Sequence, residues 1–173
     1  MPLSLPLRRI AALAAFAICA AILPARAEMA APTGEVILTV SGTIAETNSP
    51  EGAAFDMEML QALPAISFET TTTWTEGPHT FEGVPLKTLL DAVGAEGGKI
   101  TATALNSYSV DIPLDAVEDA APIIAYHIDG ETFSRRDKGP LWIVFPYDSS
   151  DKYQSELVYG WSIWQLAGLT ISN

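Results

Sequence analysis

Short segments with the composition of β-strands recur along this chain from residue 35 to its end. Each is rich in β-branched or aromatic residues, and most alternate apolar with polar positions, as a strand with one buried face does. Because isolated strands are not stable in water, a chain with many such segments must pair them into sheets. We predict strands at residues 35–44, 66–74, 79–82, 99–105, 108–112, 123–128 and 141–145, with residues 159–165 and 169–171 closing the domain.

Two segments have the periodicity of helices instead. Residues 55–63 place apolar side chains at helical spacing, with Asp56 positioned to cap the first turn. A second helix is predicted to begin at Pro85, with Gly94 as the residue that follows its C-cap. Asp129-Gly130 is a strong signal for a hairpin turn. Many short strands with two or three short helices predict a single α+β domain built on a mixed, strand-rich sheet.

The first 27 residues have the pattern of a secretory signal peptide. Arg8 and Arg9 provide a positive start, residues 10–23 form an apolar stretch, and residues 25–27 give an A-x-A cleavage pattern. The apolar stretch is shorter than a membrane-spanning helix requires, so cleavage before Glu28 is expected in place of an uncleaved anchor. We therefore expect a protein exported to a bacterial periplasm, with no membrane insertion after cleavage.

Composition excludes several functions for the remaining residues, 28–173, whose length suits one domain. They carry six Lys or Arg against 21 Asp or Glu, a net charge of −15, which argues against nucleic acid or anionic lipid as a partner. The one cysteine, Cys19, lies in the predicted signal peptide. The mature domain is therefore expected to have no disulfide, no thiolate metal ligand and no cysteine nucleophile.

The sequence lacks the patterns that support hydrolysis, metal binding or nucleotide binding. There is no G-x-S-x-G motif, and only His79 and His127 are available as bases. These histidines lie 48 positions apart without a metal-binding spacing, and no glycine-rich phosphate loop is present. The many acidic residues are explained by a solvated surface. A binding function is therefore favoured over catalysis.

Aromatic and basic residues are concentrated in residues 134–164. This segment holds seven of the 15 aromatic residues and four of the six Lys or Arg that follow the predicted signal peptide. Flat rings together with cationic donors suit a flat, hydrogen-bonding ligand. The alternative is that the rings belong to the core and the cations to a solvated turn.

The predicted ligand-binding residues combine this segment with two polar turns. They are Thr73, Trp74, Asn106, Tyr108, Arg135, Arg136, Lys138, Gly139, Trp142 and Trp164. An amide side chain in a turn offers a donor and an acceptor to the edge of a heterocycle, and a Gly-Pro turn brings backbone close to a ligand. Each residue also has a structural alternative: the tryptophans as core, Asn106 as a turn residue, and one arginine paired with a surface carboxylate.

Four motifs, taken together, resemble a known family. They read TTTTWTEG, FEGVPLKTLLDAVGA, ALNSYSVDIPLDA and DGETFSRRDKGPLWIVFPYD, and they resemble the sulfite-oxidase-type molybdopterin-binding domain from residue 36 to the C-terminus. In catalytic members of that family, a cysteine thiolate at the end of the second strand binds molybdenum. Thr70 stands at that position here, and a neutral hydroxyl does not replace a soft, anionic thiolate. The resemblance implies the fold and a pterin-shaped pocket, with no molybdenum expected.

This departure makes the chain most similar to the small periplasmic pterin-binding proteins of the same fold, the PruR-like group. The resemblance implies a non-catalytic protein that binds a free reduced pterin and signals its occupancy to an inner-membrane sensor, a diguanylate cyclase or a histidine kinase. The implied roles are stacking for Trp74, Trp142 or Trp164, recognition of the ring edge for Asn106 and Tyr108, and hydrogen-bond donation for Arg135, Arg136 and Lys138. Two alternatives stay open: a molybdopterin-dependent oxidoreductase or a subunit of one, and an interaction module without a ligand.

Overall fold

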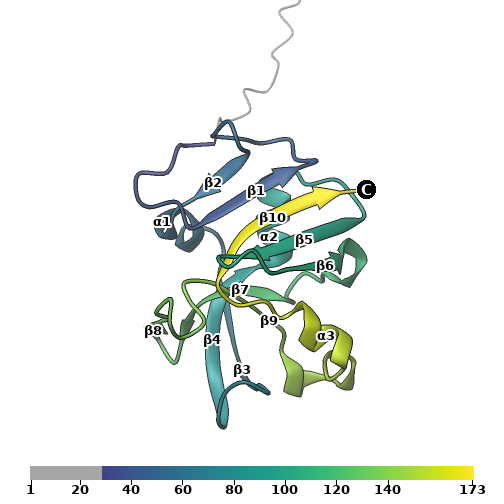
Figure 1. The fold of residues 1–173 in the computed structure, drawn as a ribbon. Helices are drawn as coiled ribbons and strands as arrows, with labels where there is room; N and C mark the ends of the chain where they lie inside the picture. The colour runs from purple at the N-terminus through teal and green to yellow at the C-terminus, as the bar shows by residue number, and fades with distance from the viewer. Residues whose placement is uncertain (1–28) are drawn as a thin grey trace, which may run out of the picture.

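The computed structural model describes residues 29–173, so the predicted signal peptide and its cleavage site lie outside the described residues. The described chain forms ten strands in two sheets, with three α-helices (Figure 1). The elements are β1 (Leu38–Gly42), β2 (Ala53–Phe55), α1 (Met57–Gln61), β3 (Ile66–Thr71), β4 (Pro78–Pro85), α2 (Leu86–Ala92), β5 (Lys99–Ala104), β6 (Ser109–Pro113), β7 (Ile123–Ile128), β8 (Glu131–Thr132), β9 (Trp142–Val144), α3 (Glu156–Trp161) and β10 (Leu166–Ser172). Short 3-10 helices cover Leu114–Ala116 (η1), Tyr147–Ser149 (η2) and Asp151–Tyr153 (η3). The predicted single α+β domain is confirmed.

The first sheet has the strand order β2-β1-β10-β5-β6. β1 pairs with β10 in parallel and the other neighbours are antiparallel, so the sheet is mixed as predicted. Buried and partly exposed residues alternate along β1 and β5, which shows that one face of this sheet covers the core. None of the described helices is long and apolar enough to span a membrane.

The second sheet runs β3-β4-β7-β8, and β9 joins the other side of β7. β7 occupies the predicted residues and lies between β4 and β9, and its first four side chains are buried in the hydrophobic core. Asp129 and Gly130 connect β7 to β8 with φ values of +51° and +81°. Both values are positive, as a two-residue hairpin turn requires, so the predicted hairpin is confirmed.

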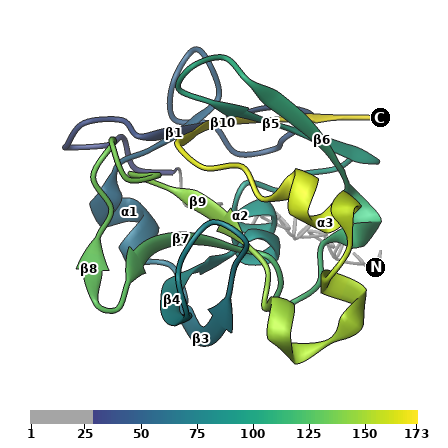
Figure 2. The same cartoon turned by 60° about the horizontal axis from the view of Figure 1, so that its bottom comes forward.

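The two sheets meet where the segment leading into β10 lies against β9. The Ile143 N–H donates to the Ile163 carbonyl and the Leu166 N–H to the Leu141 carbonyl, both at 3.0 Å. Between these bonds, Trp142 and Trp164 form a backbone bridge. Figure 2 shows the first sheet above and the second sheet below it, with the helices beneath the first sheet. One hydrophobic core is shared by both sheets.

Local capping explains the helices that were predicted. Asp56 caps α1, since its Oδ1 accepts from the Met59 N–H at 2.9 Å, and Gly94 follows α2 with a φ of +59°. Pro85 was predicted as the first helical residue but is extended, so α2 begins one residue later.

Three further features of the fold differ from the sequence predictions. β3 ends at Thr71, three residues before the predicted end, because the following threonines bond within a turn. β2 and α3 were not predicted. β2 has only three residues, and α3 is a six-residue helix that Ser155 caps by accepting from the Val158 N–H.

Candidate functional site

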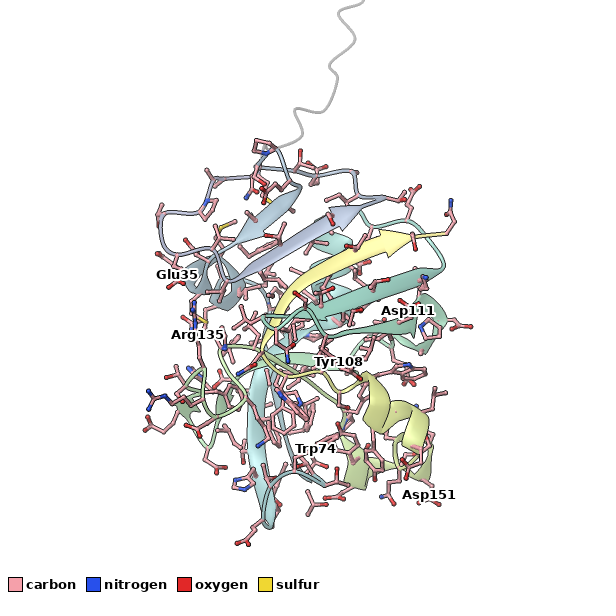
Figure 3. The ribbon with its side chains drawn as sticks, in the orientation of Figure 1. Glu35, Trp74, Tyr108, Asp111, Arg135 and Asp151 are labelled. Atoms are coloured by element: carbon pink, nitrogen blue, oxygen red, sulfur yellow. The ribbon has the colours of Figure 1, made fainter. Side chains whose placement is uncertain are left out.

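A pocket of about 360 Å³ is formed by three segments that are distant in sequence. It lies between the β5–β6 turn, the end of α3 with the segment that follows, and the loop between β3 and β4. The lining residues are Trp74, Ala104, Asn106, Tyr108, Tyr159, Gly160, Ser162, Ile163, Trp164 and Gln165. Figure 3 shows Trp74 and Tyr108 on the side of the molecule that carries α3. Four of these ten residues are aromatic and none is charged, so the pocket suits a planar, uncharged ring.

Trp74 lies at the centre of the aromatic cluster behind the pocket. Its ring centroid is 5.8 Å from those of Trp142 and Trp164, 6.0 Å from Tyr159 and 6.3 Å from Tyr147. The interplanar angles lie between 66° and 88°, the edge-to-face arrangement that aromatic quadrupoles favour. Contacts from four rings, carried by β9, η2, α3 and the segment before β10, fix the orientation of Trp74.

Trp164 and Trp142 have opposite environments although their backbones pair. Trp142 is fully buried, and its Nε1 donates to the Ser162 carbonyl at 3.1 Å. Trp164 is 39% exposed and lines the pocket. Trp142 was predicted as one of three candidate stacking residues, but it presents no surface to the pocket. It supports Trp74 and Trp164 from behind, so only these two of the predicted tryptophans line the pocket wall.

A buried hydroxyl pair fixes the floor of the site. The Tyr147 hydroxyl and Ser162 Oγ are 2.5 Å apart, and Ser162 Oγ donates to the Val158 carbonyl at 3.0 Å. Because the single proton of the Ser162 hydroxyl is donated to Val158, Tyr147 is the donor and Ser162 Oγ the acceptor in the bond between the two hydroxyls. Burial raises the pKa of Tyr147 to about 12, although the Ser162 hydroxyl acts in the opposite direction. Tyr147 is therefore a neutral donor at physiological pH and holds a residue of the pocket wall.

The β5–β6 turn brings Asn106 and Tyr108, two of the predicted binding residues, to the pocket wall. Asn106 Oδ1 accepts from the Tyr108 N–H at 3.0 Å, and Ser107 between them has a φ of +67°. Asn106 is thus also the turn residue of the structural alternative. Its amide nitrogen makes no hydrogen bond to the described residues and remains a donor at the pocket. Tyr108 is 59% exposed and stands at the rim.

The predicted cationic residues lie outside the pocket wall. Arg135 forms an ion pair with Glu35 at 2.5 Å, on the edge of the molecule opposite α3 in Figure 3. Arg136 is exposed on the same loop. The Lys138 ammonium lies 5.7 Å from the Trp142 ring centroid, behind the wall. The structural alternative for one arginine, a surface ion pair, therefore holds for Arg135.

The loop with these cations contacts the pocket through Gln165. The Gln165 N–H donates to the Lys138 carbonyl at 3.0 Å, and its side-chain amide donates to the Arg135 carbonyl. Gly139 is buried against Phe133, whose carbonyl oxygen lies 2.3 Å from where a Gly139 Cβ would stand. Gly139 therefore permits close packing of the loop on the protein and does not face the pocket.

Thr70 and Thr73 occupy different positions near the site. Thr70, at the end of β3, is 1% exposed, and its hydroxyl donates to the Thr71 carbonyl at 3.2 Å and accepts from the Asp148 N–H at 3.1 Å. Thr73 precedes Trp74 in an exposed turn and does not line the pocket. Of the ten predicted residues, the structure brings four to the pocket wall: Trp74, Asn106, Tyr108 and Trp164.

Each of the two histidines lies against a different carboxylate. His79 Nδ1 lies 2.6 Å from Asp129, and His127 Nδ1 lies 3.1 Å from Glu82. The first interaction holds the pKa of Asp129 below its usual range, because His79 and the Thr80 N–H donate to the carboxylate. Among residues 29–173, no group of three or more His, Cys, Asp or Glu side chains is arranged to hold a metal ion.

Six residues of the pocket wall were not predicted. They are Ala104, Tyr159, Gly160, Ser162, Ile163 and Gln165. Five of them belong to YGWSIWQ, which spans residues 159–165 and overlaps the aromatic-rich segment 134–164. The signal was present in composition, but the helix α3 that turns this stretch toward the pocket was not predicted.

Comparisons with known proteins agree on the fold. The family described as the oxidoreductase molybdopterin binding domain matches residues 38–150. The crystal structure of the sulfane dehydrogenase SoxCD from Paracoccus pantotrophus is similar, with a TM-score of 0.57 and 20% sequence identity over 78% of this chain. The match covers 37% of that chain, so this protein spans well under half of its neighbour's length. No curated protein matches the sequence. By its sequence match and its fold, the chain belongs to the oxidoreductase molybdopterin-binding domain family.

Proposed function

We propose that this protein is a non-catalytic, exported pterin-binding protein that reports pterin occupancy to an inner-membrane sensor. The observation that carries the proposal is the uncharged, aromatic-walled pocket in a domain whose family is named for binding a pterin cofactor. The volume of about 360 Å³ is within the range of small-molecule sites. Export rests on the pattern of the first 27 residues.

The pocket wall supplies the two interactions that a pterin ring requires. Trp74 and Trp164 offer aromatic surface, and stacking on such side chains contributes about 1–3 kcal/mol per ring. The amide of Asn106 can donate to a ring oxygen or nitrogen at the edge of the ligand. Because the Trp74 and Trp164 rings lie at 69° to each other, a planar ligand that stacks on one of them meets the other at its edge. One stacked face, one edge contact and a few hydrogen bonds suit a dissociation constant of about 1 μM, which corresponds to about −8 kcal/mol.

The environment of Thr70 supports a ligand without thiolate-bound molybdenum. Its hydroxyl is buried and already donates to one protein group and accepts from another. A neutral oxygen in this state does not provide the soft anionic donor that would replace a cysteine thiolate. The residues therefore fit the organic ring of the family's cofactor and do not fit a cysteine-ligated metal at this position.

The rim of the pocket supports contact with a protein partner. Of the five large hydrophobic side chains most exposed among residues 29–173, Leu105, Tyr108, Leu157 and Trp164 belong to the turn, helix and segment that form the pocket. Leu157 is 63% exposed and Tyr108 59%. Exposed apolar side chains that gather on one face are typical of interaction sites. A partner on this rim would contact the ligand's surroundings directly and so sense occupancy.

The second candidate function is that of a molybdopterin-dependent oxidoreductase or a subunit of one. The family to which the chain belongs and the fold shared with an oxidoreductase subunit favour it. This candidate requires molybdenum to be held with the pterin without a protein thiolate.

One experiment separates the two candidates. The full-length protein is expressed with its N-terminal signal, purified natively from periplasmic extract, and its released small molecules are identified by mass spectrometry beside metal analysis of the same sample. We expect a free reduced pterin at near-stoichiometric occupancy without molybdenum. Stoichiometric molybdenum with a dithiolene pterin would establish the oxidoreductase instead. A protein that carries no pterin and does not bind added tetrahydrobiopterin would refute both.

A matched pair of variants assigns the ligand to this pocket. Trp164→Leu should reduce the amount of pterin recovered. Trp161→Leu changes a tryptophan on the same segment that does not line the pocket, so it should leave the amount of pterin unchanged.

Contact with a partner is tested with a photoreactive residue at exposed position 157. We expect it to cross-link an inner-membrane protein in cells that make pterin, and no cross-link would contradict the signalling role.

A further inference from the structure

A network of threonine hydroxyls shapes the loop that carries Trp74. The Trp74 N–H donates to Thr72 Oγ1 at 3.1 Å, and this oxygen lies 2.8 Å from Thr75 Oγ1. Side-chain oxygens that accept from the N–H two residues later stabilise tight turns in place of a strand ladder. The run of threonines therefore does not continue β3. We call residues 71–77 the Trp74 turn.

The carboxylate of Asp148, a residue distant in sequence, accepts hydrogen bonds from the start of this turn. Asp148 Oδ2 accepts from the Thr71 N–H at 2.6 Å, and Asp148 Oδ1 accepts from Thr71 Oγ1 at 2.8 Å. The Asp148 N–H in turn donates to Thr70 Oγ1 at 3.1 Å. Three hydrogen bonds thus join two segments that are 77 or 78 positions apart.

Asp148 belongs to the 3-10 helix η2, and this helix also contacts the Trp74 ring. Tyr147, next to Asp148 in η2, lies 6.3 Å from the Trp74 ring and 5.2 Å from the Tyr159 ring. The backbone and side-chain donors of Thr71 hold the pKa of Asp148 below its usual range. η2 therefore holds both the backbone at the start of the Trp74 turn and the aromatic ring of Trp74.

We propose that Asp148 is a positioning residue that holds the Trp74 turn so that the Trp74 ring stays at the pocket wall. Asp148 is exposed and does not line the pocket, so it acts on the ligand only through Trp74. This inference rests on the proposed pterin-binding function for its effect on affinity. Its effect on Trp74 itself does not depend on any ligand.

The binding test is a double-mutant cycle in the full-length exported protein, with anaerobic titration of tetrahydrobiopterin by calorimetry. Asp148→Asn retains the size of the side chain but replaces one of its two acceptors with a donor. We expect it to weaken binding about 10-fold, as coupled neighbours typically do. In a Trp74→Ala background the same change should have no further effect. A full 10-fold loss in that background would overturn the inference, because Asp148 would then act by another route.

Two variants test whether the effect is specific. Thr71→Val removes the hydroxyl that Asp148 accepts from but leaves the N–H, so we expect a smaller loss than with Asp148→Asn. Asp151→Asn changes a nearby exposed carboxylate whose side chain makes no hydrogen bond within residues 29–173. It should bind tetrahydrobiopterin like the unmodified protein. An equal loss in Asp151→Asn would show a general effect of surface charge and would refute the positioning role.

A ligand-free measurement separates failure of this inference from failure of the proposed function. Acrylamide quenching of tryptophan fluorescence should rise in Asp148→Asn, and Trp74→Phe should abolish that rise. This quenching result supports the positioning role even if the unmodified protein binds no tetrahydrobiopterin. The absence of binding would refute only the proposed function. Unchanged quenching in Asp148→Asn would refute the positioning role whatever the ligand.

Discussion

Replacing Tyr147 with phenylalanine tests the buried hydroxyl pair on which the pocket wall depends. The change removes the donor to Ser162 Oγ at 2.5 Å and leaves the ring in place against Trp74, Phe145 and Tyr159. A buried hydrogen bond between neutral groups contributes about 1 kcal/mol to the free energy of unfolding. We therefore expect Tyr147→Phe to be about 1 kcal/mol less stable at pH 7.

The same residue makes the difference in stability depend on pH. The pKa of Tyr147 is raised from 10.0 to about 12 in the folded protein, so deprotonation favours the unfolded chain above pH 10. The unmodified protein should lose up to about 2.7 kcal/mol as the pH rises through this range, at about 1.36 kcal/mol per unit. Tyr147→Phe lacks this group. The two stabilities should therefore become equal near about pH 10.7, and the order should reverse above it.

Urea unfolding followed by far-ultraviolet circular dichroism measures this crossing. Both proteins are unfolded at pH 7 and at several values between pH 9 and 11, and the difference in the free energy of unfolding is plotted against pH. The pKa of Tyr126 is also raised, by burial and to a smaller extent by the charge of Glu82. Tyr126 is present in both proteins, so its contribution to the pH dependence cancels in the difference. Tyr153→Phe is the control, since its hydroxyl bonds the half-exposed Glu118 at 3.2 Å and has no buried hydroxyl partner. A gap between the two proteins that stays constant up to pH 11 would refute the reasoning.

Three further variants distinguish core, pocket and surface. Trp142→Ala removes a fully buried ring and should lower the free energy of unfolding by about 3–5 kcal/mol in urea titration; a loss below about 1 kcal/mol would contradict its place in the core. Trp164→Leu should weaken tetrahydrobiopterin binding about 5- to 100-fold in calorimetry, with a smaller loss of stability than Trp142→Ala; unchanged affinity would remove Trp164 from the site. Arg135→Ala breaks an exposed ion pair with Glu35 and should cost less than about 1 kcal/mol without changing affinity, whereas a large loss of binding would restore its predicted role as a ligand donor.

Local patterns in the sequence determined most of the elements. The apolar run of residues 123–128 predicted β7 at its observed bounds, and Asp129-Gly130 predicted the hairpin that follows. Asp56 and Gly94 marked helix ends because capping depends on residues only a few positions apart. The motifs also identified the family, which the match over residues 38–150 confirmed. These features depend on short-range geometry, so the order of residues along the chain is sufficient to predict them.

The site itself was decided by contacts between distant segments. Composition indicated a cluster of rings, but whether a tryptophan belongs to the core or the pocket depends on the strand that covers it. Trp142 lies within β9 and is fully buried, whereas its bridge partner Trp164 precedes β10 and is 39% exposed. Arg135 pairs with a carboxylate 100 positions away and does not line the pocket. Only the folded structure places Trp74, Asn106 and Trp164 around one volume, because the three segments that carry them are distant in sequence and are brought together by different strands of the two sheets.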